Sequence, residues 1–251
     1  MKTILQHLFI LAVAIIGLGC GEKSAHKATI RPTMPTYALI EIVRMNQYES
    51  FQQYFEGHLA GLREAGGKYV VINREPQVME GSHRPCHAFM IQEWPDTASF
   101  HAWYNSDEFR PWHELLLESA DIRIALLSGA DLREELSLFN IGTEYNKPAY
   151  VLTEVHRYAD QESFNKYYDN YLRLVEASGG RFLAQQPDYD VIEGEFPEFE
   201  LVALLQWPTA QDYLNFFGSE DFAIWLELRR TTSLGNVLLF ESESLPERLR
   251  W

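Results

Sequence analysis

Apolar positions along the chain alternate between strand-like runs and helix-like spacing, and the first such unit begins near position 37. Residues 37–44 (YALIEIVR) form a dense apolar run that is typical of a β-strand. Between residues 51 and 65, apolar side chains recur at three- and four-residue steps, as on one face of a helix, and Gly66-Gly67 ends this pattern. The first folded unit is therefore predicted to start with a strand and a helix.

The pattern beyond Gly67 predicts three more strands and a second helical region. The strands are expected at residues 68–72 continued by 77–80 after a break near Pro76, at 86–94 and at 122–127. Asp96 with Ser99 is typical of a helix start, and helical spacing continues to Leu117. The order strand–helix–strand–strand–helix–strand predicts an α+β, ferredoxin-like domain, with a four-stranded antiparallel sheet and both helices on one face.

The whole pattern occurs twice. A shift of 113 positions (150 − 37) places Tyr150 on Tyr37, and the alignment continues without a gap over about 93 positions. Further identical pairs are Glu154 and Glu41, Gly179-Gly180 and Gly66-Gly67, Glu193-Gly194 and Glu80-Gly81, and Trp207-Pro208 and Trp94-Pro95. A repeat of this length indicates two copies of one domain.

The repeat sets the domain boundaries. We expect a first domain at 36–130, a connector at 131–147, a second domain at 148–243 and a tail at 244–251. Each four-stranded sheet would leave one apolar face open, so the two sheets are expected to cover each other within the chain. Such an intrachain pseudo-dimer predicts a monomeric protein.

Composition excludes some partners. The chain has 21 Lys and Arg against 36 Asp and Glu, a formal net charge of −15, which argues against a nucleic-acid partner. Aromatic content of 14% supplies enough bulk for two cores. Phosphate-binding glycine loops, nucleophile elbows, the His-Glu-x-x-His motif and zinc knuckles do not occur, which argues against hydrolase, kinase and nucleotide-dependent activities.

The first 19 residues are predicted to be a signal peptide. Lys2 precedes an apolar run of about 11 residues, too short to span a bilayer comfortably. The run ends in Gly17-Leu18-Gly19-Cys20-Gly21, which resembles a bacterial lipobox, although Gly17 stands where leucine is usual. The resemblance implies an acylated Cys20, a tether at 20–35 and a bilayer partner in the cell envelope, at the outer membrane facing the periplasm. The alternative is an ordinary secretory signal with a chance cysteine.

The second copy carries a set of motifs that resembles a known family. The motifs are Gly-Gly-Arg-Phe-Leu at 179–183, Val-Ile-Glu-Gly at 191–194, Trp-Pro-Thr at 207–209, Phe-Phe-Gly-Ser-Glu-Asp-Phe at 216–222 and Arg229-Arg230. They resemble domain-of-unknown-function 1330, within the dimeric α+β barrel superfamily. The first copy departs from the pattern, with Leu116-Leu117 in place of the two arginines. The resemblance implies two ferredoxin-like repeats packed as an intrachain dimeric α+β barrel, and it implies no general activity.

Four glutamates are candidate functional groups. The sheet–helix interior of each copy could hold a small cavity, which all four could line. Glu41 and Glu154 lie inside apolar strand runs, where a buried carboxylate could act as an acid or base. They could instead face solvent or pair with Arg44 and Arg157. Glu80 and Glu193 each precede a glycine, so they could line a cavity between sheet and helices or simply belong to turns.

Histidines are concentrated in the first copy. His83, Cys86 and His87 lie within five residues, and His87 is the ligand-binding candidate among them. Strand alternation would place Cys86 and His87 on opposite faces, so these side chains do not converge easily on a metal ion. We expect no metal site and no cofactor.

The function expected from the sequence is the binding of a small apolar or aromatic molecule by a membrane-tethered protein. The alternatives are an enzyme of the cofactor-free monooxygenase or haem-handling type, and a structural envelope protein. The two copies are not expected to be equivalent. The second is the expected site, because it contains Glu154, Glu193 and Arg229, and because Arg229 can offer a fork of donors to a carboxylate.

Overall fold

The computed structural model describes residues 34–129 and 147–241 of the chain. The expected signal peptide, Cys20 and the tail lie outside these ranges. Only residues 34–35 of the expected tether and residue 147 of the expected connector lie within them. Within the described ranges, no helix is both long enough and apolar enough to cross a membrane.

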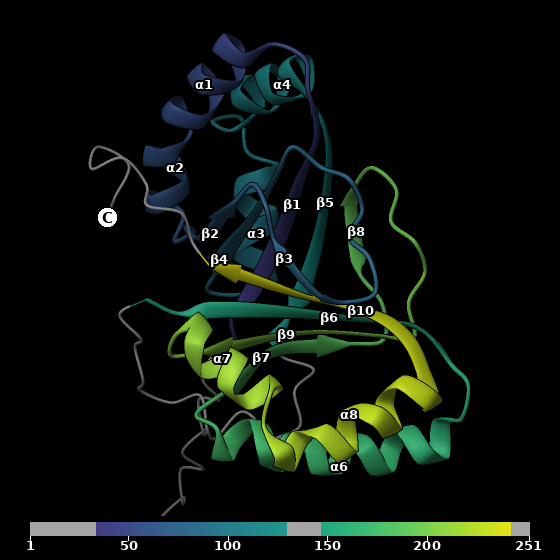
Figure 1. The fold of residues 1–251 in the computed structure, drawn as a ribbon. Helices are drawn as coiled ribbons and strands as arrows, with labels where there is room; N and C mark the ends of the chain where they lie inside the picture. Colours follow the sequence, from purple (N-terminus) through teal and green to yellow (C-terminus); the bar gives the residue numbers. More distant parts are fainter. Residues whose placement is uncertain (1–33, 130–146, 242–251) are drawn as a thin grey trace, which may run out of the picture. The chain divides into compact units, whose positions relative to one another are not determined.

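The first copy contains five strands and four short helices (Figure 1). In chain order they are β1 (Thr36–Met45), α1 (Tyr48–Gly57), α2 (Leu59–Glu64), β2 (Lys68–Asn73), β3 (Gln77–Glu80), β4 (Ala88–Trp94), α3 (Thr97–Tyr104), α4 (Arg110–Ser119) and β5 (Ala120–Ser128). The single helix expected at 51–65 is divided at His58, which ends α1 and precedes α2.

The second copy repeats this order, with the single helix α6 in the place of α1 and α2. Its elements are β6 (Ala149–Tyr158), α6 (Gln161–Ala177), β7 (Arg181–Gln186), β8 (Asp190–Glu193), β9 (Leu201–Trp207), α7 (Ala210–Phe217), α8 (Glu220–Thr232) and β10 (Ser233–Glu241). Asp96, Asp160 and Thr209 each accept a hydrogen bond from the backbone three residues on, as N-cap residues do. The helix start expected at Asp96 is confirmed, and the second copy begins its helices in the same way.

Each sheet has five strands, because each copy gives one strand to the other. The sheet orders are β2-β4-β1-β5-β8 and β3-β10-β6-β9-β7. The expected second strand is thus two strands: β2 stays in its own sheet, while β3 pairs with β10 of the second copy. Its counterpart β8 pairs with β5 of the first copy. The expectation of four-stranded sheets was wrong, and the break near Pro76 marks the point where the chain changes sheets.

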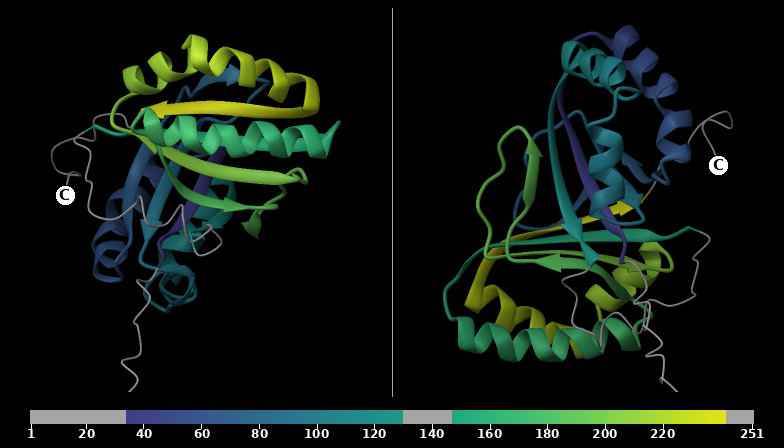
Figure 2. Two further views of the ribbon diagram at one scale, coloured as in Figure 1. Left: turned by 90° about the horizontal axis from the view of Figure 1, so that it is seen from below. Right: turned by 180° about the vertical axis from the view of Figure 1, so that it is seen from behind.

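The two sheets share one core and each has a second core beneath its helices. Along β1, Tyr37 and Leu39 join Tyr150 and Leu152 in the core between the sheets, whereas Ala38, Ile40 and Ile42 face the first copy's helices. Phe89 and Phe240 stack between the sheets with ring centroids 4.4 Å apart. Figure 2 shows the sheets facing each other with the helices on their outer sides. The expected α+β class and sheet-to-sheet packing are confirmed.

Gly81 is predicted to be far less tolerant of a side chain than Gly179, although both have positive φ angles, of 73° and 80°. A Cβ at Gly81 would lie 2.5 Å from the backbone oxygen of Gly235 in the other copy, whereas at Gly179 the nearest atom is 3.7 Å away. We expect Gly179→Ala to cost about 1–2 kcal/mol, from backbone strain alone. Gly81→Ala should cost at least about 3 kcal/mol, because the clash adds to that strain. Urea unfolding measures both, and equal losses would contradict the close crossing of the copies.

Candidate functional site

Two glutamates cross from one copy to the other. Glu80 is the last residue of β3 and Glu193 the last residue of β8, and both strands pair with the other copy's sheet. Gly81 and Gly194 follow them with positive φ angles, which lets the chain turn away. The sheet–helix interior of each copy therefore receives a carboxylate from its neighbour.

In the second copy this carboxylate meets two arginines at the end of α8. Glu80 Oε2 accepts a hydrogen bond from Arg229 Nη1, and its Oε1 accepts one from Arg230 Nε. Arg229 is only 4% exposed, whereas the side chain of Arg230 is half exposed. Within the described part of the chain, Arg229 Nη2 is buried without a hydrogen-bond partner. Two positive groups and one negative group leave this cluster with a charge of +1.

A narrow cavity lies beside this cluster, between the second sheet and α6, α7 and α8. Aromatic residues dominate its wall, which also includes Glu80, Arg229 and Thr153; the aromatic members are Tyr167, Tyr171, Tyr213, Phe216, Phe217 and Phe222. The space open to the centre of a water molecule is about 10 Å³, about enough for one water.

Three tyrosines make this wall amphipathic. Burial raises the pKa of Tyr167, Tyr171 and Tyr213 above the ordinary value of 10.0. Tyr171 and Tyr213 line the same cavity as Arg229 and Glu80, and the charges of that ion pair also act on their pKa values. All three phenols therefore keep their protons at neutral pH and can donate hydrogen bonds inside an otherwise apolar space.

The first copy surrounds its donated carboxylate with different groups. Glu193 Oε1 accepts a 2.7 Å hydrogen bond from the Tyr104 hydroxyl and lies 3.0 Å from His113 Nε2. Leu116 occupies the position that corresponds to Arg229 (229 − 113 = 116). Burial, followed by the hydrogen bond to Glu193, raises the pKa of Tyr104. Each interior thus receives one donated glutamate, but the polar groups that meet it differ.

His58 is a core residue of the first copy. Its Nδ1 lies 2.9 Å from the carbonyl oxygen of Tyr54, and its Nε2 lies 3.1 Å from the Tyr69 hydroxyl. Burial lowers the pKa of His58 to about 4, so the ring is neutral at pH 7. A neutral ring can donate from Nδ1 to the carbonyl and accept at Nε2 from the hydroxyl, which satisfies both nitrogens.

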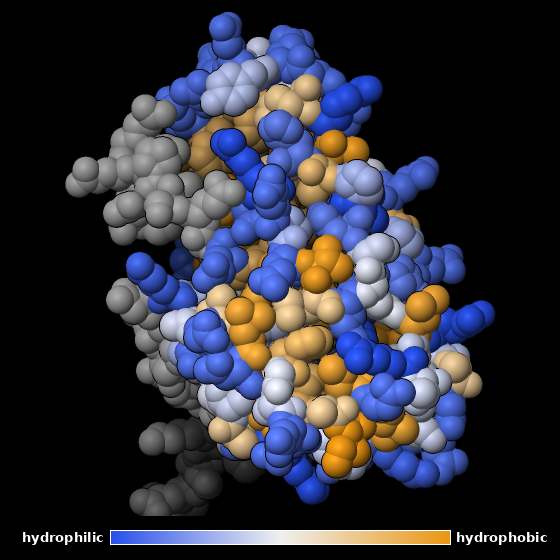
Figure 3. All heavy atoms as spheres, in the orientation of Figure 1, coloured by the Kyte–Doolittle hydropathy of each residue, from blue (hydrophilic) through white to orange (hydrophobic). Residues whose placement is uncertain are grey.

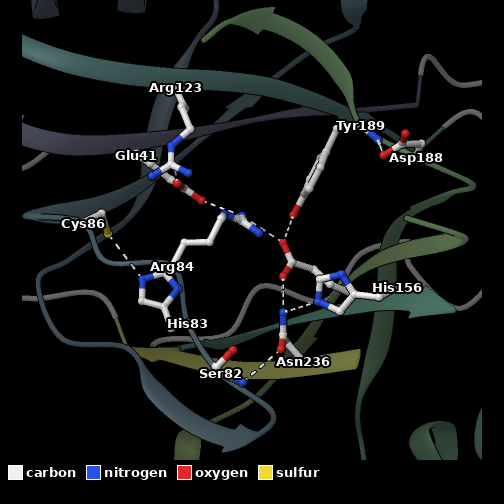
Figure 4. A network of polar contacts seen from close by, with 11 residues as sticks. Glu41, Ser82, His83, Arg84, Cys86, Arg123, His156, Asp188, Tyr189 and Asn236 are labelled. Carbon is white, nitrogen blue, oxygen red and sulfur yellow. Dashed lines mark hydrogen bonds and ion pairs between the residues drawn. The ribbon is translucent and has the colours of Figure 1, made fainter. Parts of the chain in front are cut away.

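A third polar cluster, the central clamp, lies between the two sheets (Figure 4). Arg84 Nη2 donates to Glu41 Oε1 at 2.7 Å and to Glu154 Oε1 at 3.0 Å, so one arginine joins equivalent glutamates of the two copies. Glu41 is 0% exposed and Glu154 1% exposed. Burial acts to lower the pKa of Arg84, but the charges of Glu154 and Glu41 outweigh it and raise that pKa overall.

Neighbouring groups complete the central clamp. Arg123 Nε lies 3.1 Å from Glu41 Oε2. Glu154 accepts hydrogen bonds from the Tyr189 hydroxyl and from Asn236 Nδ2. Phe196 and Phe199 place their rings 5.4 and 5.7 Å from the Arg84 guanidinium, distances typical of cation–π contacts. The two buried carboxylates are therefore balanced by two arginines, as buried charges must be.

The position of Glu41 and Glu154 corrects the sequence interpretation. Both were candidates for the lining of a sheet–helix cavity; the alternatives were a solvent-facing strand edge, or a pair with Arg44 or Arg157. Instead they continue the strand faces that point between the sheets, and Arg44 pairs with Asp121 at 2.7 Å. The central clamp fastens the copies together and does not line the aromatic cavity.

Cys86 and its neighbouring histidines show no metal-binding geometry. Cys86 Sγ lies 3.3 Å from His83 Nε2, while His87 is exposed. Burial raises the pKa of Cys86 to about 11, which makes the thiol a poor nucleophile. Across residues 34–129 and 147–241, no group of three His, Cys, Asp or Glu side chains is placed to hold a metal ion.

The outer side of α8 offers a shallow apolar hollow as well. Ile224, Trp225 and Leu228 contribute to its lining, and Ile224 is 75% exposed. Apolar side chains gather over the lower half of the molecule in Figure 3. Glu227 is the one charged group among the lining residues, so this hollow has little with which to orient a ligand.

Glu154, Glu193 and Arg229 do not form one site, contrary to the expectation from the sequence. Glu154 belongs to the central clamp, Glu193 lies in the first copy, and Arg229 binds Glu80 from the first copy. Strand exchange is the physical reason, because it carries each donated glutamate out of its own copy. Sequence reasoning also missed Arg84, which lies in a Gly- and Pro-containing loop where no periodic pattern indicates burial.

Comparison with known proteins places the chain in a family. The model of the family "Domain of unknown function (DUF1330)" matches residues 35–130 and 148–242, most of the chain and both copies. The protein is a tandem member of this DUF1330 family. No curated protein matches the chain.

Several solved structures resemble the chain at low identity. A provisionally assigned monooxygenase from Fusobacterium nucleatum is 11% identical, with a TM-score of 0.49, over 84% of this chain and 94% of that one. A second such protein, from Lactobacillus acidophilus, is 8% identical, with a TM-score of 0.45, over 82% of this chain and 93% of that one. A mutant chlorite dismutase from Candidatus Nitrospira defluvii is 11% identical, with a TM-score of 0.45, over 85% of this chain and 93% of that one.

Arg84 is predicted to be one of the most important polar residues for stability. Arg84→Ala leaves two buried carboxylates without their shared partner, which should cost about 3–5 kcal/mol of unfolding free energy. Arg44→Ala is the matched control, because its ion pair with Asp121 is solvent-exposed, and it should cost less than about 1 kcal/mol. Chemical denaturation measures both losses.

A further set of variants separates the charge of Arg84 from its packing. In a Glu41→Gln/Glu154→Gln background, Arg84→Ala should be clearly less damaging, because no carboxylate is left unpaired. An equal loss in both backgrounds would show that Arg84 stabilises the protein by packing alone.

Proposed function

We propose that this DUF1330 protein binds a small aromatic molecule in the interior of its second copy. The observation that carries the proposal is Arg229 Nη2, a buried donor on the wall of an aromatic cavity that has no partner among the residues the structure describes. An unsatisfied buried donor costs about 1–3 kcal/mol. An acceptor group of a bound molecule would remove that cost, which supports a ligand at this position.

The composition of the cavity wall is the reason to expect an aromatic ligand. Six aromatic rings surround the space, and tyrosine hydroxyls near the Arg229–Glu80 pair can donate hydrogen bonds to a polar substituent. Apolar walls with a few convergent polar groups are typical of small-molecule sites. Because the present space is about that of one water, a ring can enter only as side chains such as Phe217 move apart.

Binding fits the chemistry of this cavity better than catalysis. Glu80 is held by two arginines, an arginine does not exchange protons near neutral pH, and the pKa values of the tyrosines are raised further from 7. General acid–base catalysis needs a group with a pKa near the working pH. The cavity wall therefore has donors for recognition, and its titratable groups are poorly suited to proton transfer.

Phenol should bind to the second copy and to no equivalent place in the first. We expect a Kd of about 1 mM or tighter. This corresponds to a binding free energy of about 0.6 kcal/mol for each non-hydrogen atom of phenol. Amide NMR shifts should change along α6, α8 and β10 with one saturable curve. Thr153→Ile, which copies Ile40 of the first copy, should narrow the cavity and weaken binding about tenfold or more.

The control for this experiment lies in the first copy. His113→Leu copies Leu226 of the second copy and should leave phenol binding unchanged. Saturable shifts confined to the first copy, or none at all in the wild type, would contradict the proposed function.

We further propose that the protein is anchored in the bacterial envelope through an acylated Cys20, at the outer membrane facing the periplasm. The support is the sequence Gly17-Leu18-Gly19-Cys20-Gly21 after an apolar run. Mass spectrometry of the native protein should find an N-terminal peptide that begins at lipid-modified Cys20, and Cys20→Ser should abolish the modification. An unmodified N-terminus at Gly21 or later would refute the anchor.

A further inference from the structure

The contacts of Glu80 leave Arg229 incompletely used. An arginine side chain binds a carboxylate best through two parallel N–H···O bonds. Arg229 contacts Glu80 through Nη1 alone, because the second carboxylate oxygen of Glu80 accepts from Arg230. Nη2 of Arg229 is buried and finds no hydrogen-bond partner within residues 34–129 and 147–241. Glu80 therefore binds the cavity's buried arginine but uses only one of its two terminal nitrogens.

Arg230 provides a second place for the Glu80 carboxylate. Its side chain is half exposed, whereas that of Arg229 is 5% exposed. Glu80 could keep Arg230 as its partner near the surface while another carboxylate took both terminal nitrogens of Arg229. A ligand with one negative charge would also bring the +1 charge of the cluster to zero.

We propose that the natural ligand is an aromatic carboxylate and that its carboxylate displaces Glu80 from Arg229. The inference rests on the proposed function, because the aromatic part of the ligand must occupy the same cavity. Glu80 then acts as a built-in competitor that the first copy supplies to the second copy's site. Ligand and Glu80 exchange on one guanidinium group, and no covalent bond changes.

Two probes of similar size separate this inference from the proposed function. Benzoate carries a carboxylate, and benzyl alcohol carries a neutral hydroxyl on the same ring system. Both are titrated by calorimetry into the full mature chain, as wild type, as Glu80→Gln and as Glu193→Gln. Glu193→Gln is the matched control, because Glu193 is the equivalent donated glutamate and faces Tyr104 and His113.

Glu80→Gln removes the competing charge and keeps the shape of the side chain. Benzoate should bind Glu80→Gln at least about tenfold more tightly than the wild type, while the affinity of benzyl alcohol changes less than about twofold. Glu193→Gln should change neither affinity. Adding Arg229→Gln to Glu80→Gln should abolish the gain for benzoate.

Each failure has a separate meaning. If benzyl alcohol binds but benzoate gains nothing in Glu80→Gln, the exchange is refuted and the aromatic site stands. If neither probe binds the wild type or Glu80→Gln, the proposed function fails as well. If benzoate affinity rose as much in Glu193→Gln as in Glu80→Gln, the gain would come from the net charge of the protein and not from Glu80. That result would overturn the inference.

A measurement on the wild type keeps the test open if Glu80→Gln does not fold. Benzoate should shift the side-chain ¹⁵N resonances of Arg229 and the ¹³C carboxyl resonance of Glu80, whereas benzyl alcohol should leave the Glu80 resonance in place. A Glu80 carboxyl resonance unmoved at benzoate saturation would refute the exchange.

Discussion

The structure depends on the exchange of one short strand in each direction. β3 and β8 have four residues each, and each completes the edge of a sheet that belongs mostly to the other copy. Unpaired sheet edges are open to wrong pairing, so neither copy has a finished sheet until its partner is in place. Packing between the sheets, the position of Arg84 and the composition of both interiors all follow from this pairing.

Much of the fold could be predicted from the sequence because its helices and strands depend on local patterns of residues. Apolar periodicity, cap residues such as Asp96 and the repeat indicated the elements, and two open apolar faces indicated how the sheets meet. Pairing partners of strands are not a local property, so 77–80 was read as the continuation of 68–72. The interruption at Pro76 was the available signal, and it was interpreted as a break within one strand.

The candidate site was harder to predict, for the same reason. Glu41 shares a strand face with Tyr37 and Leu39, which alternation alone could have shown. Both faces of β1 are buried, however, so alternation could not tell which one meets the other copy. Arg229 was identified from a motif, but its partner Glu80 is 149 positions away in the chain, and only the exchanged strand explains the contact.

The central clamp shows what fusion of the two copies into one chain makes possible. Arg84 binds the equivalent glutamates of both copies at once, and Pro197 stands at the matching position of the second copy. In a symmetric homodimer every side chain is present twice, so two arginines would compete for one place between the same two carboxylates. A fused pair is free of that symmetry, and its halves meet at a high effective concentration that their linker maintains. Single-copy features such as Arg84 and Arg229 can therefore arise in one half without being imposed on the other.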